Sequence, residues 1–350
     1  MTDRLYKKYM ARCLQLALNG EGTTYPNPLV GSVIVHNGKI IGEGFHYKAG
    51  EPHAEVNAIN SVKNKELLKN STLYVNLEPC AHYGRTPPCS LAIIQNNIPK
   101  VVIGCIDTFS KVAGKGIEMM CNAGVEVITG ILEEESRYVN RRFFTFHEKE
   151  RPYVILKWAQ TLDGFIDVER LPEAEAQPTW ITNEWARRAV HKQRSTEQAV
   201  LIGTNTALKD DPSLTLRNWK GVPPVRIVID RTLRLPSSLK VFTGSEQTII
   251  LNEKKNENRG HVKFIKVDLS ENSTYNILKT LKEQGLQSVV VEGGRHTLTE
   301  FIESGLWDEA FVYVGEKWFN KGVKAPMINQ DPVEKQEFGN SKLFVYRNMS

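Results

Sequence analysis

The stretch His53-Ala54-Glu55, read together with Pro79-Cys80 and with Cys89, decides how the first part of the chain is organised. One imidazole and two thiolates are ligands of the kind that zinc prefers, and three protein ligands leave the fourth position of a tetrahedral ion open for water. Zinc lowers the pKa of that water to about 7, and a nearby carboxylate can move protons between the water and a substrate nitrogen. The pattern predicts a hydrolytic zinc site with His53, Cys80 and Cys89 as metal ligands and Glu55 as the catalytic acid–base.

The two cysteines are more widely spaced than the usual pair, which has two residues between them. Eight residues intervene here, from Ala81 to Pro88, and the rigid Thr86-Pro87-Pro88 can return Cys89 to the metal. An H-x-E sequence followed by P-C and a further cysteine is typical of zinc nucleobase deaminases. A structural zinc site is the main alternative. It would normally have four protein ligands, and His82 could supply the fourth.

The composition is that of a globular protein with two or three domains. Of 350 residues, 41% are hydrophobic and 24% are charged. The formal charge of +5 is evenly spread and forms no basic stripe, so no nucleic-acid partner is expected. No apolar run approaches the length of about 18 residues that a membrane span needs, and Met1 to Gly20 lacks the apolar core of a signal peptide. No membrane partner is expected.

The five cysteines do not suggest a disulfide framework. Two are assigned to zinc, and Cys13, Cys105 and Cys121 are expected to be small buried hydrophobic residues. A reducing, cytoplasmic location is the simplest interpretation.

Strands alternate with helices in residues 1–147, which indicates an α/β domain with parallel strand pairs. Asn37-Gly38 lies between two apolar runs and predicts a hairpin. Helices that begin near His53 and near Pro88 would place metal ligands at helix N-termini, where the backbone dipole favours a thiolate. The expected strands are 29–35, 40–45, 72–77, 101–106 and 125–128, and the other expected helices are 5–20, 115–122 and 133–144.

A charged stretch that ends at Pro152 marks a boundary, and a second α/β domain follows over residues 151–350. Its expected strands are 153–158, 200–203, 225–230, 248–251, 262–267, 288–291 and 309–314, with helices at 183–194, 274–284 and 297–304. Arg170 to Pro178 is acidic and bracketed by prolines, and is expected to be a surface loop. Glu292-Gly293-Gly294 follows a strand, where backbone N–H groups can hold a phosphate, although a plain glycine turn fits equally well. No G-x-G-x-x-G motif occurs, so a Rossmann cofactor site is not supported.

Over nearly its full length the chain resembles the bifunctional riboflavin-biosynthesis family, in which a pyrimidine deaminase is fused to a pyrimidine reductase. The order and spacing of the motifs carry this resemblance. They are 26–31, Gly44-Phe45-His46, 52–55, 78–80, 86–89, 156–159, Leu162-Asp163-Gly164, Trp180-Ile181-Thr182, 203–206, Asp210-Asp211-Pro212, Leu214-Thr215, Arg217 and 291–294.

The resemblance implies a cytidine-deaminase-like, three-layer α/β/α domain at 1–147 and a dihydrofolate-reductase-like α/β domain at 151–350. It implies two cofactors, Zn²⁺ and NADPH. Water activated by zinc would remove an amine from a pyrimidine, with Glu55 shuttling protons. NADPH would then reduce the ribose to a ribityl chain. The implied substrate is a diaminopyrimidinone that carries a ribosylamino 5'-phosphate, and the implied assembly is a homo-oligomer, either a dimer or a tetramer.

The resemblance also assigns roles to residues of this chain. Substrate-binding roles in the deaminase half fall on Asn27, His46 and Arg85. Catalytic roles in the reductase half fall on Lys157, Asp210 and Glu292. The other substrate-binding positions are Arg194, Leu214, Arg217 and again Glu292, with Arg194 and Arg217 at the substrate phosphate. NADPH would contact Ala159, Trp180, Thr206, Asp210, Gly294, Arg295, His296 and Thr297.

Three departures from the family pattern affect individual contacts. Arg85 stands where many relatives have Lys, and Arg231 stands where relatives often have Ser. The segment before Trp180 lacks the usual Ser/Gly-rich run, and Pro178 falls where a substrate-contacting Ser is common.

Two other functions are consistent with parts of the sequence. One is a zinc deaminase for a free nucleoside or a tRNA base, with the second half as a recognition domain; the missing basic patch and the Lys157/Glu292 pair argue against it. The other is a non-catalytic, zinc-stabilised binding protein. Glu55 argues against that one, because a structural metal site needs no carboxylate beside the ion.

Overall fold

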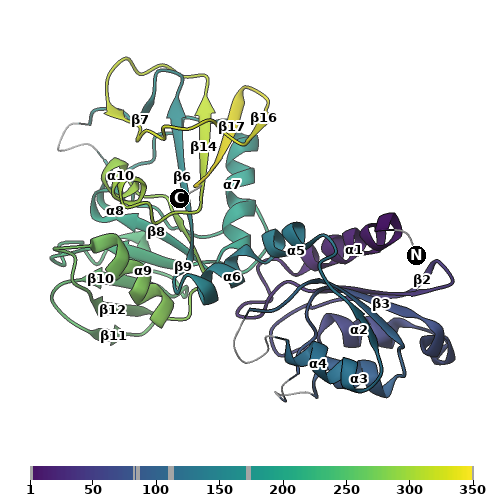
Figure 1. Ribbon diagram of the computed structural model, residues 1–350. Coiled ribbons are helices and arrows are strands. Elements are labelled where there is room, and N and C mark those ends of the chain that lie inside the picture. The colour runs from purple at the N-terminus through teal and green to yellow at the C-terminus, as the bar shows by residue number, and fades with distance from the viewer. Residues whose placement is uncertain (1–2, 82, 84–86, 109–113, 171–174, 349–350) are drawn as a thin grey trace. The chain divides into compact units, whose positions relative to one another are not determined.

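The computed structural model describes the whole chain except residues 1–2, 82, 84–86, 109–113, 171–174 and 349–350. The chain divides into two compact units, Met1–Lys149 (unit 1) and Glu150–Ser350 (unit 2), which are coloured along the chain in Figure 1. Among the described residues, the model contains no helix that combines the length and the apolar character needed to span a bilayer.

Unit 1 is built on a five-stranded sheet of strand order β2-β1-β3-β4-β5. Strand β1 pairs antiparallel with β2 and β3, whereas β3, β4 and β5 are parallel. The elements are α1 (Asp3–Ala17), η1 (Leu18–Gly20), β1 (Gly31–His36), β2 (Lys39–Phe45), α2 (Ala54–Ser61), η2 (Lys65–Asn70), β3 (Thr72–Leu77), α3 (Cys89–Gln95), β4 (Lys100–Cys105), α4 (Lys115–Asn122), β5 (Glu126–Ile128), α5 (Glu133–Val139) and α6 (Arg141–Glu148).

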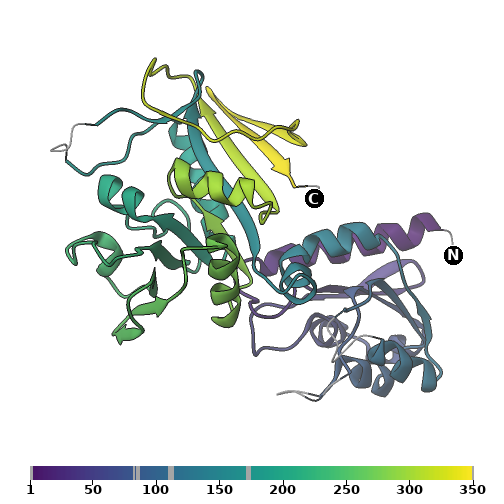
Figure 2. The ribbon, with the colours of Figure 1, turned by 60° about the vertical axis from the view of Figure 1, so that its left-hand side comes forward.

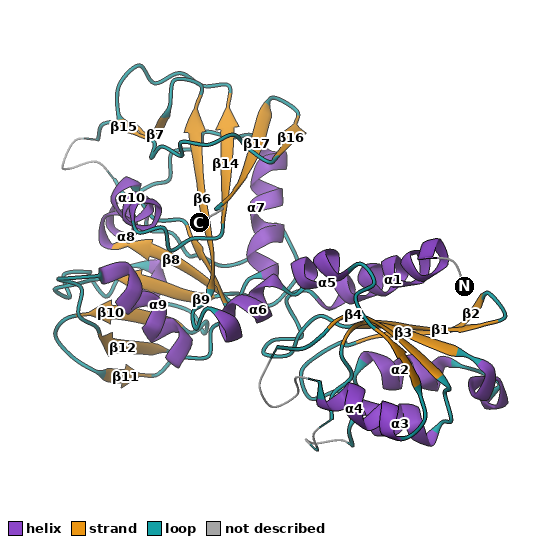
Figure 3. Ribbon diagram, viewed as in Figure 1, coloured by secondary structure: helices purple, strands orange, loops and turns teal. Residues whose placement is uncertain are grey.

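Helices cover both faces of this sheet and make three layers, as Figure 3 shows. Because side chains alternate along a strand, each strand supplies two cores. Ile34 and Val75 face α2, α3 and α4, whereas Val33 and Tyr74 face α1. The alternation in the sequence therefore fixes which helices lie on which face.

Unit 2 contains a ten-stranded sheet of order β11-β12-β10-β9-β8-β13-β6-β14-β17-β16. The strands from β12 to β14 are parallel, and β11, β17 and β16 are antiparallel to their neighbours. The elements are β6 (Tyr153–Thr161), β7 (Phe165–Asp167), α7 (Glu184–Thr196), β8 (Ala199–Gly203), α8 (Thr204–Asp210), β9 (Val225–Ile229), η3 (Lys240–Phe242), β10 (Thr248–Asn252), β11 (Glu257–Arg259), β12 (Val262–Lys266), α9 (Ser273–Glu283), β13 (Ser288–Val291), α10 (Arg295–Glu303), β14 (Glu309–Gly315), β15 (Val323–Lys324), β16 (Glu334–Phe338) and β17 (Ser341–Arg347).

The central strands of unit 2 join segments that are far apart in the chain. Strand β6 pairs with β14, and Figure 2 shows the teal and yellow-green strands side by side. Helices α9 and α10 pack on one face through Leu281 and Phe301. The opposite face is covered by α7 and α8, which contribute Ala186 and Ala207 to the core. The carboxyl ends of β6, β8 and β13 meet between these helices.

The structure differs from the sequence prediction in several elements. The single helix expected at 133–144 is two helices, broken at Asn140, and the second helix ends only at Glu148. Helix α8 and strands β7, β11, β15, β16 and β17 were not predicted. Cys121 was expected to be buried but is exposed, because it lies on the outer side of α4.

Gly44 allows α2 to lie against β2. A Cβ added to Gly44 would come within 2.4 Å of the Ala58 nitrogen and 2.7 Å of the Ala54 oxygen, both backbone atoms. We therefore expect Gly44→Ala to lower the free energy of unfolding of unit 1 by about 2 kcal/mol, since overpacking displaces backbone. Urea unfolding measures the change. Lys39→Ala, at the exposed start of β2, is the control and should stay within about 0.5 kcal/mol of the parent chain. A Gly44→Ala chain as stable as the parent would contradict this packing.

Candidate active sites

Three metal-binding side chains converge in unit 1. The ligand atoms of His53, Cys80 and Cys89 all lie within 4.8 Å of one another. The His53 Nδ1 atom is 3.6 Å from Cys80 Sγ and 3.2 Å from Cys89 Sγ. A donor set of one imidazole nitrogen and two sulfurs fits a zinc ion with one open position. The geometry therefore agrees with the metal ligands that the sequence predicts.

The local fold delivers each of these ligands to the cluster. His53 is the N-cap of α2, and Cys89 is the first residue of α3, so both lie at helix N-termini. Cys80 follows β3, and its Sγ accepts a hydrogen bond from the Cys89 backbone N–H at 3.3 Å. Hydrogen bonding from the Cys89 thiol, together with His53, lowers the pKa of the Cys80 thiol. A lowered thiol pKa favours metal binding, because the thiolate is the form that binds.

Glu55 is placed to exchange protons beside the metal ligands. It lies in the first turn of α2, and only 3% of its surface is exposed. Burial raises the pKa of its carboxyl to about 7. A pKa near neutrality suits a group that must both take up and release a proton.

His46 and Asn27 form a polar wall next to His53. The rings of His46 and His53 meet edge to face with centroids 5.2 Å apart. His46 Nε2 is 3.0 Å from the Asn27 amide nitrogen, and His46 Nδ1 is 3.2 Å from the Pro52 carbonyl oxygen. Burial lowers the pKa of His46. The neutral tautomer that satisfies both contacts carries its proton on Nδ1.

Two asparagines hold the segment that carries Asn27. Asn140 accepts a hydrogen bond from the Leu29 N–H at 2.7 Å and donates one to the Leu29 oxygen at 2.9 Å. Asn76 donates to the same oxygen at 3.0 Å and accepts from the Gly31 N–H at 2.8 Å. Asn140 lies at the break between α5 and α6, and there its amide group faces the Leu29 backbone.

Glu78 fixes the chain immediately before Cys80. Only 4% of its surface is exposed, and its carboxylate accepts hydrogen bonds from the backbone N–H groups of Gly114 and Gly116 at 3.0 Å. It also accepts from Asp107 at 3.3 Å. A buried carboxylate satisfied by several N–H donors resists displacement. Glu78 thus ties the metal-binding turn to the start of α4.

Unit 2 contains a cavity of about 730 Å³ at the carboxyl ends of its parallel strands. Ligands of α/β sheets commonly bind at this edge, and the volume suits a cofactor or a drug-sized molecule. The cavity wall includes every reductase residue that the sequence predicts: Lys157, Ala159, Trp180, Arg194, Thr206, Asp210, Leu214, Arg217, Glu292, Gly294, Arg295, His296 and Thr297.

Glu292 joins two cations in the wall of this cavity. Its carboxylate receives two hydrogen bonds from Arg194, both at 2.6 Å, and Lys157 Nζ lies 3.4 Å away. Burial alone would raise the pKa of Glu292, but the charges of Arg194 and Lys157 outweigh burial and hold it at about 2. Burial lowers the pKa of Lys157. Glu292 therefore stays ionised, whereas Lys157 gives up a proton more readily than an exposed lysine.

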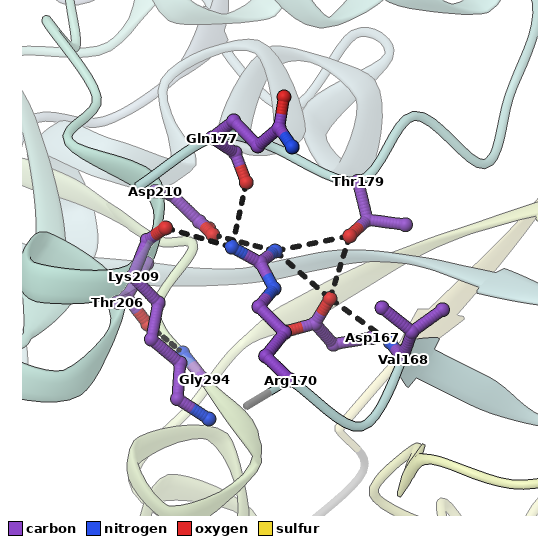
Figure 4. Close-up of polar contacts among 9 residues, drawn as sticks. All are labelled: Asp167, Val168, Arg170, Gln177, Thr179, Thr206, Lys209, Asp210 and Gly294. Carbon is purple, nitrogen blue, oxygen red and sulfur yellow. Dashed lines mark hydrogen bonds and ion pairs between the residues drawn. The ribbon is translucent and has the colours of Figure 1, made fainter. Parts of the chain in front are cut away.

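A second network, centred on Arg170, lines another part of the cavity. Figure 4 shows its guanidinium between Asp167, Thr179 and Asp210, at 2.9, 3.0 and 3.1 Å respectively. The same guanidinium donates to the Gln177 and Lys209 carbonyl oxygens, both at 2.7 Å. Burial raises the pKa of Asp210 to about 6, although Arg170 opposes this.

Thr206 and Gly294 connect the two glycine-containing turns of the cavity. The Gly294 N–H donates to Thr206 Oγ1 at 2.8 Å, as Figure 4 also shows. A Cβ on Gly293 would lie 2.6 Å from the Gly203 nitrogen, so the backbones of the two turns touch. This close approach is the physical reason for a glycine after Glu292.

The sequence prediction missed several residues of these sites. Arg170, Arg187 and His191 all line the cavity of unit 2. Arg187 and His191 could have been found, because they lie seven and three residues before Arg194 and therefore share its helix face. The prediction that Arg170 begins a surface loop was wrong, because its side chain is only 10% exposed and lines the cavity. Arg85 and His82, which the sequence analysis singled out, lie outside the described residues.

Comparison with known proteins gives full-length matches. The family model of the RibD C-terminal domain matches residues 152–337, and that of the cytidine and deoxycytidylate deaminase zinc-binding region matches residues 3–105. The chain is 44% identical to riboflavin biosynthesis protein RibD of Aquifex aeolicus, over 92% of this chain and 90% of the relative. It is 35% identical to RibD of Escherichia coli, over 88% of this chain and 87% of the relative.

Solved structures match equally completely. A diaminohydroxyphosphoribosylaminopyrimidine deaminase/5-amino-6-(5-phosphoribosylamino)uracil reductase from Thermotoga maritima is 38% identical, with a TM-score of 0.88 over 99% of both chains. RibD of Acinetobacter baumannii, in its form 1, is 32% identical, with a TM-score of 0.88 over 100% of both chains.

Removal of the Glu292 charge tests the buried ion cluster. We expect Glu292→Gln to lower the free energy of unfolding by about 3 kcal/mol at pH 7, because it leaves two buried cations without a carboxylate. Since the folded-state pKa of about 2 lies below the unfolded value of about 4.3, this stabilisation is complete above about pH 4.3 and is lost as the pH falls toward 2.

Urea unfolding of the parent and variant chains between pH 2 and pH 7 measures this dependence. The difference in stability should narrow as the pH falls below about 4.3. The exposed Glu283→Gln is the control and should follow the parent chain throughout. A difference that stays constant down to pH 2 would show that the Glu292 charge is not held by Arg194 and Lys157.

Proposed function

This chain belongs to the RibD family of riboflavin biosynthesis proteins, and on that premise we propose which residues carry out its two reactions. It is a bifunctional enzyme that combines a zinc-dependent pyrimidine deaminase with an NADPH-dependent pyrimidine reductase. The expected fold class is confirmed, with a cytidine-deaminase-like first domain and a dihydrofolate-reductase-like second domain. The substrate is a small phosphorylated pyrimidine.

The proposed deaminase domain comprises residues 1–147, with His53, Cys80 and Cys89 as the zinc ligands. Zinc, when bound, supplies a Lewis acid that makes water nucleophilic near neutral pH. Glu55 takes the proton of the attacking water and delivers it to the departing amine. Asn27 and His46 hold the pyrimidine and its sugar through their amide and imidazole groups. The observation that supports these roles best is the buried Glu55 carboxyl beside three converging metal ligands.

The proposed reductase domain comprises residues 151–350. NADPH, when bound, supplies the hydride. The negative charge that develops on the opening ribose needs a proton, and Lys157 is the cation with a lowered pKa in the cavity. Glu292 orients Lys157 and Arg194, and Asp210 also lies in the cavity wall. Ala159, Trp180, Thr206 and the segment 294–297 would line the cofactor.

We further propose that the enzyme works in the cytoplasm as a homo-oligomer. Two cysteines that serve as metal ligands suit a reducing compartment. Sedimentation of the purified chain would distinguish a dimer or a tetramer from a monomer. The joint activity is tested by supplying the phosphorylated diaminopyrimidine with and without NADPH while ammonia and absorbance are followed together.

Glu55→Gln separates proton transfer from metal binding. The variant should retain the zinc content of the parent chain and lose at least about 100-fold in the rate of ammonia release, because it lacks the acid–base group but keeps the ligands. Metal analysis and an ammonia assay measure the two properties. Glu51→Gln, an exposed change nearby, should leave both unchanged. Loss of zinc from Glu55→Gln would refute the assigned role.

The Lys157→Ala variant tests whether the deaminase and reductase activities use separate sites. Ammonia release should continue at the rate of the parent chain, whereas NADPH oxidation should fall by at least about 100-fold, because the proposed proton donor of the second reaction is gone. Coupled absorbance and ammonia measurements on one sample give both rates. The exposed Lys279→Ala is the control. Equal damage to both activities would contradict the proposal of two separate sites.

A further inference from the structure

One face of α7 points into the cavity of unit 2. Arg187, His191 and Arg194 all line the cavity, and their spacing of four and three residues places them on the same side of the helix. The Arg187 guanidinium lies over the Trp180 ring, 4.6 Å from its centroid. Arg194 is bonded to Glu292. Neither the sequence analysis nor the proposed mechanism uses Arg187 or His191, and of these two Arg187 is already engaged with Trp180.

The imidazole of His191 is buried, and its Nδ1 atom makes no hydrogen bond to the part of the chain that the structure describes. Only 6% of the residue is exposed. Histidines that serve packing usually bond a backbone carbonyl. His261, for example, has its Nε2 atom 3.1 Å from the Phe242 oxygen. A buried polar atom without a partner is costly, and such an atom in a cavity wall points to a ligand.

The charges around His191 favour an anionic ligand and a neutral ring. The cations that face it are Arg194, Arg217 and Lys157, and the anion is Glu292. Burial, with Arg194 and Arg217 next, lowers the pKa of His191 to about 4. Arg194 is paired with Glu292, whereas no ion pair to Arg217 occurs among the described side chains. An anion in this part of the cavity would meet one uncommitted guanidinium and one neutral imidazole.

We propose that His191 is a substrate-binding residue of the reductase, and that its ring N–H donates a hydrogen bond to the phosphate of the pyrimidine substrate. Above about pH 6 the phosphate of a monoester is mainly the dianion, whose oxygens only accept hydrogen bonds, so the partner has to carry a proton. A neutral imidazole always carries one ring N–H, and no bond to the protein fixes which nitrogen holds it. This inference rests on the proposed function of unit 2 and adds a residue and a ligand atom to it.

His191→Phe and His191→Gln test the proposal in the full-length enzyme. Phe keeps the ring volume without a donor, whereas Gln keeps an N–H donor. With the phosphorylated substrate of the reductase, His191→Phe should raise KM about tenfold, the loss expected for one hydrogen bond, and His191→Gln should stay within about threefold. The KM for NADPH and the rate of ammonia release should match the parent chain in both variants.

The same pyrimidine without its phosphate identifies the atom that His191 binds. The parent chain and His191→Phe should then have equal KM values, because the hydrogen-bond acceptor is missing from both reactions. If His191→Phe raised KM by the same factor with and without the phosphate, the effect would come from the sugar or from packing, and the proposal would be overturned. An unchanged KM of His191→Phe with the phosphorylated substrate would also overturn it.

A further measurement needs no variant and covers the case in which His191→Phe does not fold. Inorganic phosphate added to the ¹⁵N-histidine-labelled parent chain should shift the ring nitrogen signals of one buried histidine and leave the signals of exposed histidines in place. Unshifted signals at phosphate concentrations that inhibit the reductase would overturn the proposal. Failure of the proposed reductase function can be told apart from failure of the His191 proposal, because in the first case the parent chain would not oxidise NADPH at all.

Discussion

A carboxylate buried at the end of a central parallel strand has to be fully hydrogen-bonded, and both units depend on that constraint. Glu78 follows β3 and accepts backbone N–H groups, including those of Gly114 and Gly116. Glu292 follows β13 and accepts two bonds from Arg194. In unit 1 the partners are backbone groups, so the carboxylate holds a loop and its metal ligand. In unit 2 the partners are charged side chains, so the carboxylate fixes the positions of Arg194 and Lys157 in the cavity wall.

Glu55 and Glu292 show how neighbours decide what a buried carboxyl can do. Burial raises the pKa of both. Among the described residues no guanidinium acts on Glu55, and its pKa reaches about 7, which suits proton exchange. Glu292 has Arg194 and Lys157, and its pKa falls to about 2, so it remains a fixed negative charge. The same residue type is thus suited to proton exchange in one unit and to holding two cations in place in the other.

Local sequence predicted those parts of the fold that local patterns determine. The strand at 72–77 and the helix at 115–122 have the expected bounds, and the expected metal ligands converge. Strands β16 and β17 were missed, because they gain their stability from pairing at the sheet edge and β16 is polar along most of its length. The break at Asn140 depends on bonds to Leu29, 111 residues away. Such contacts leave no periodic signal in the sequence.

The segment before Trp180 shows how a departure from the family pattern changes the cavity. The resemblance places Pro178 where a substrate-contacting Ser is common, and the hydroxyl of its neighbour Thr179 is already hydrogen-bonded within the protein. The Thr179 hydroxyl already donates to Asp167 at 2.6 Å and accepts from Arg170 at 3.0 Å. The only hydrogen-bond donor of this hydroxyl therefore serves the Arg170 network and is not available to a ligand. Helix α7 contributes Arg194 and His191 to the cavity wall, and the Nδ1 atom of His191 has no hydrogen-bond partner among the described residues, which is why we propose that substrate recognition rests on this helix.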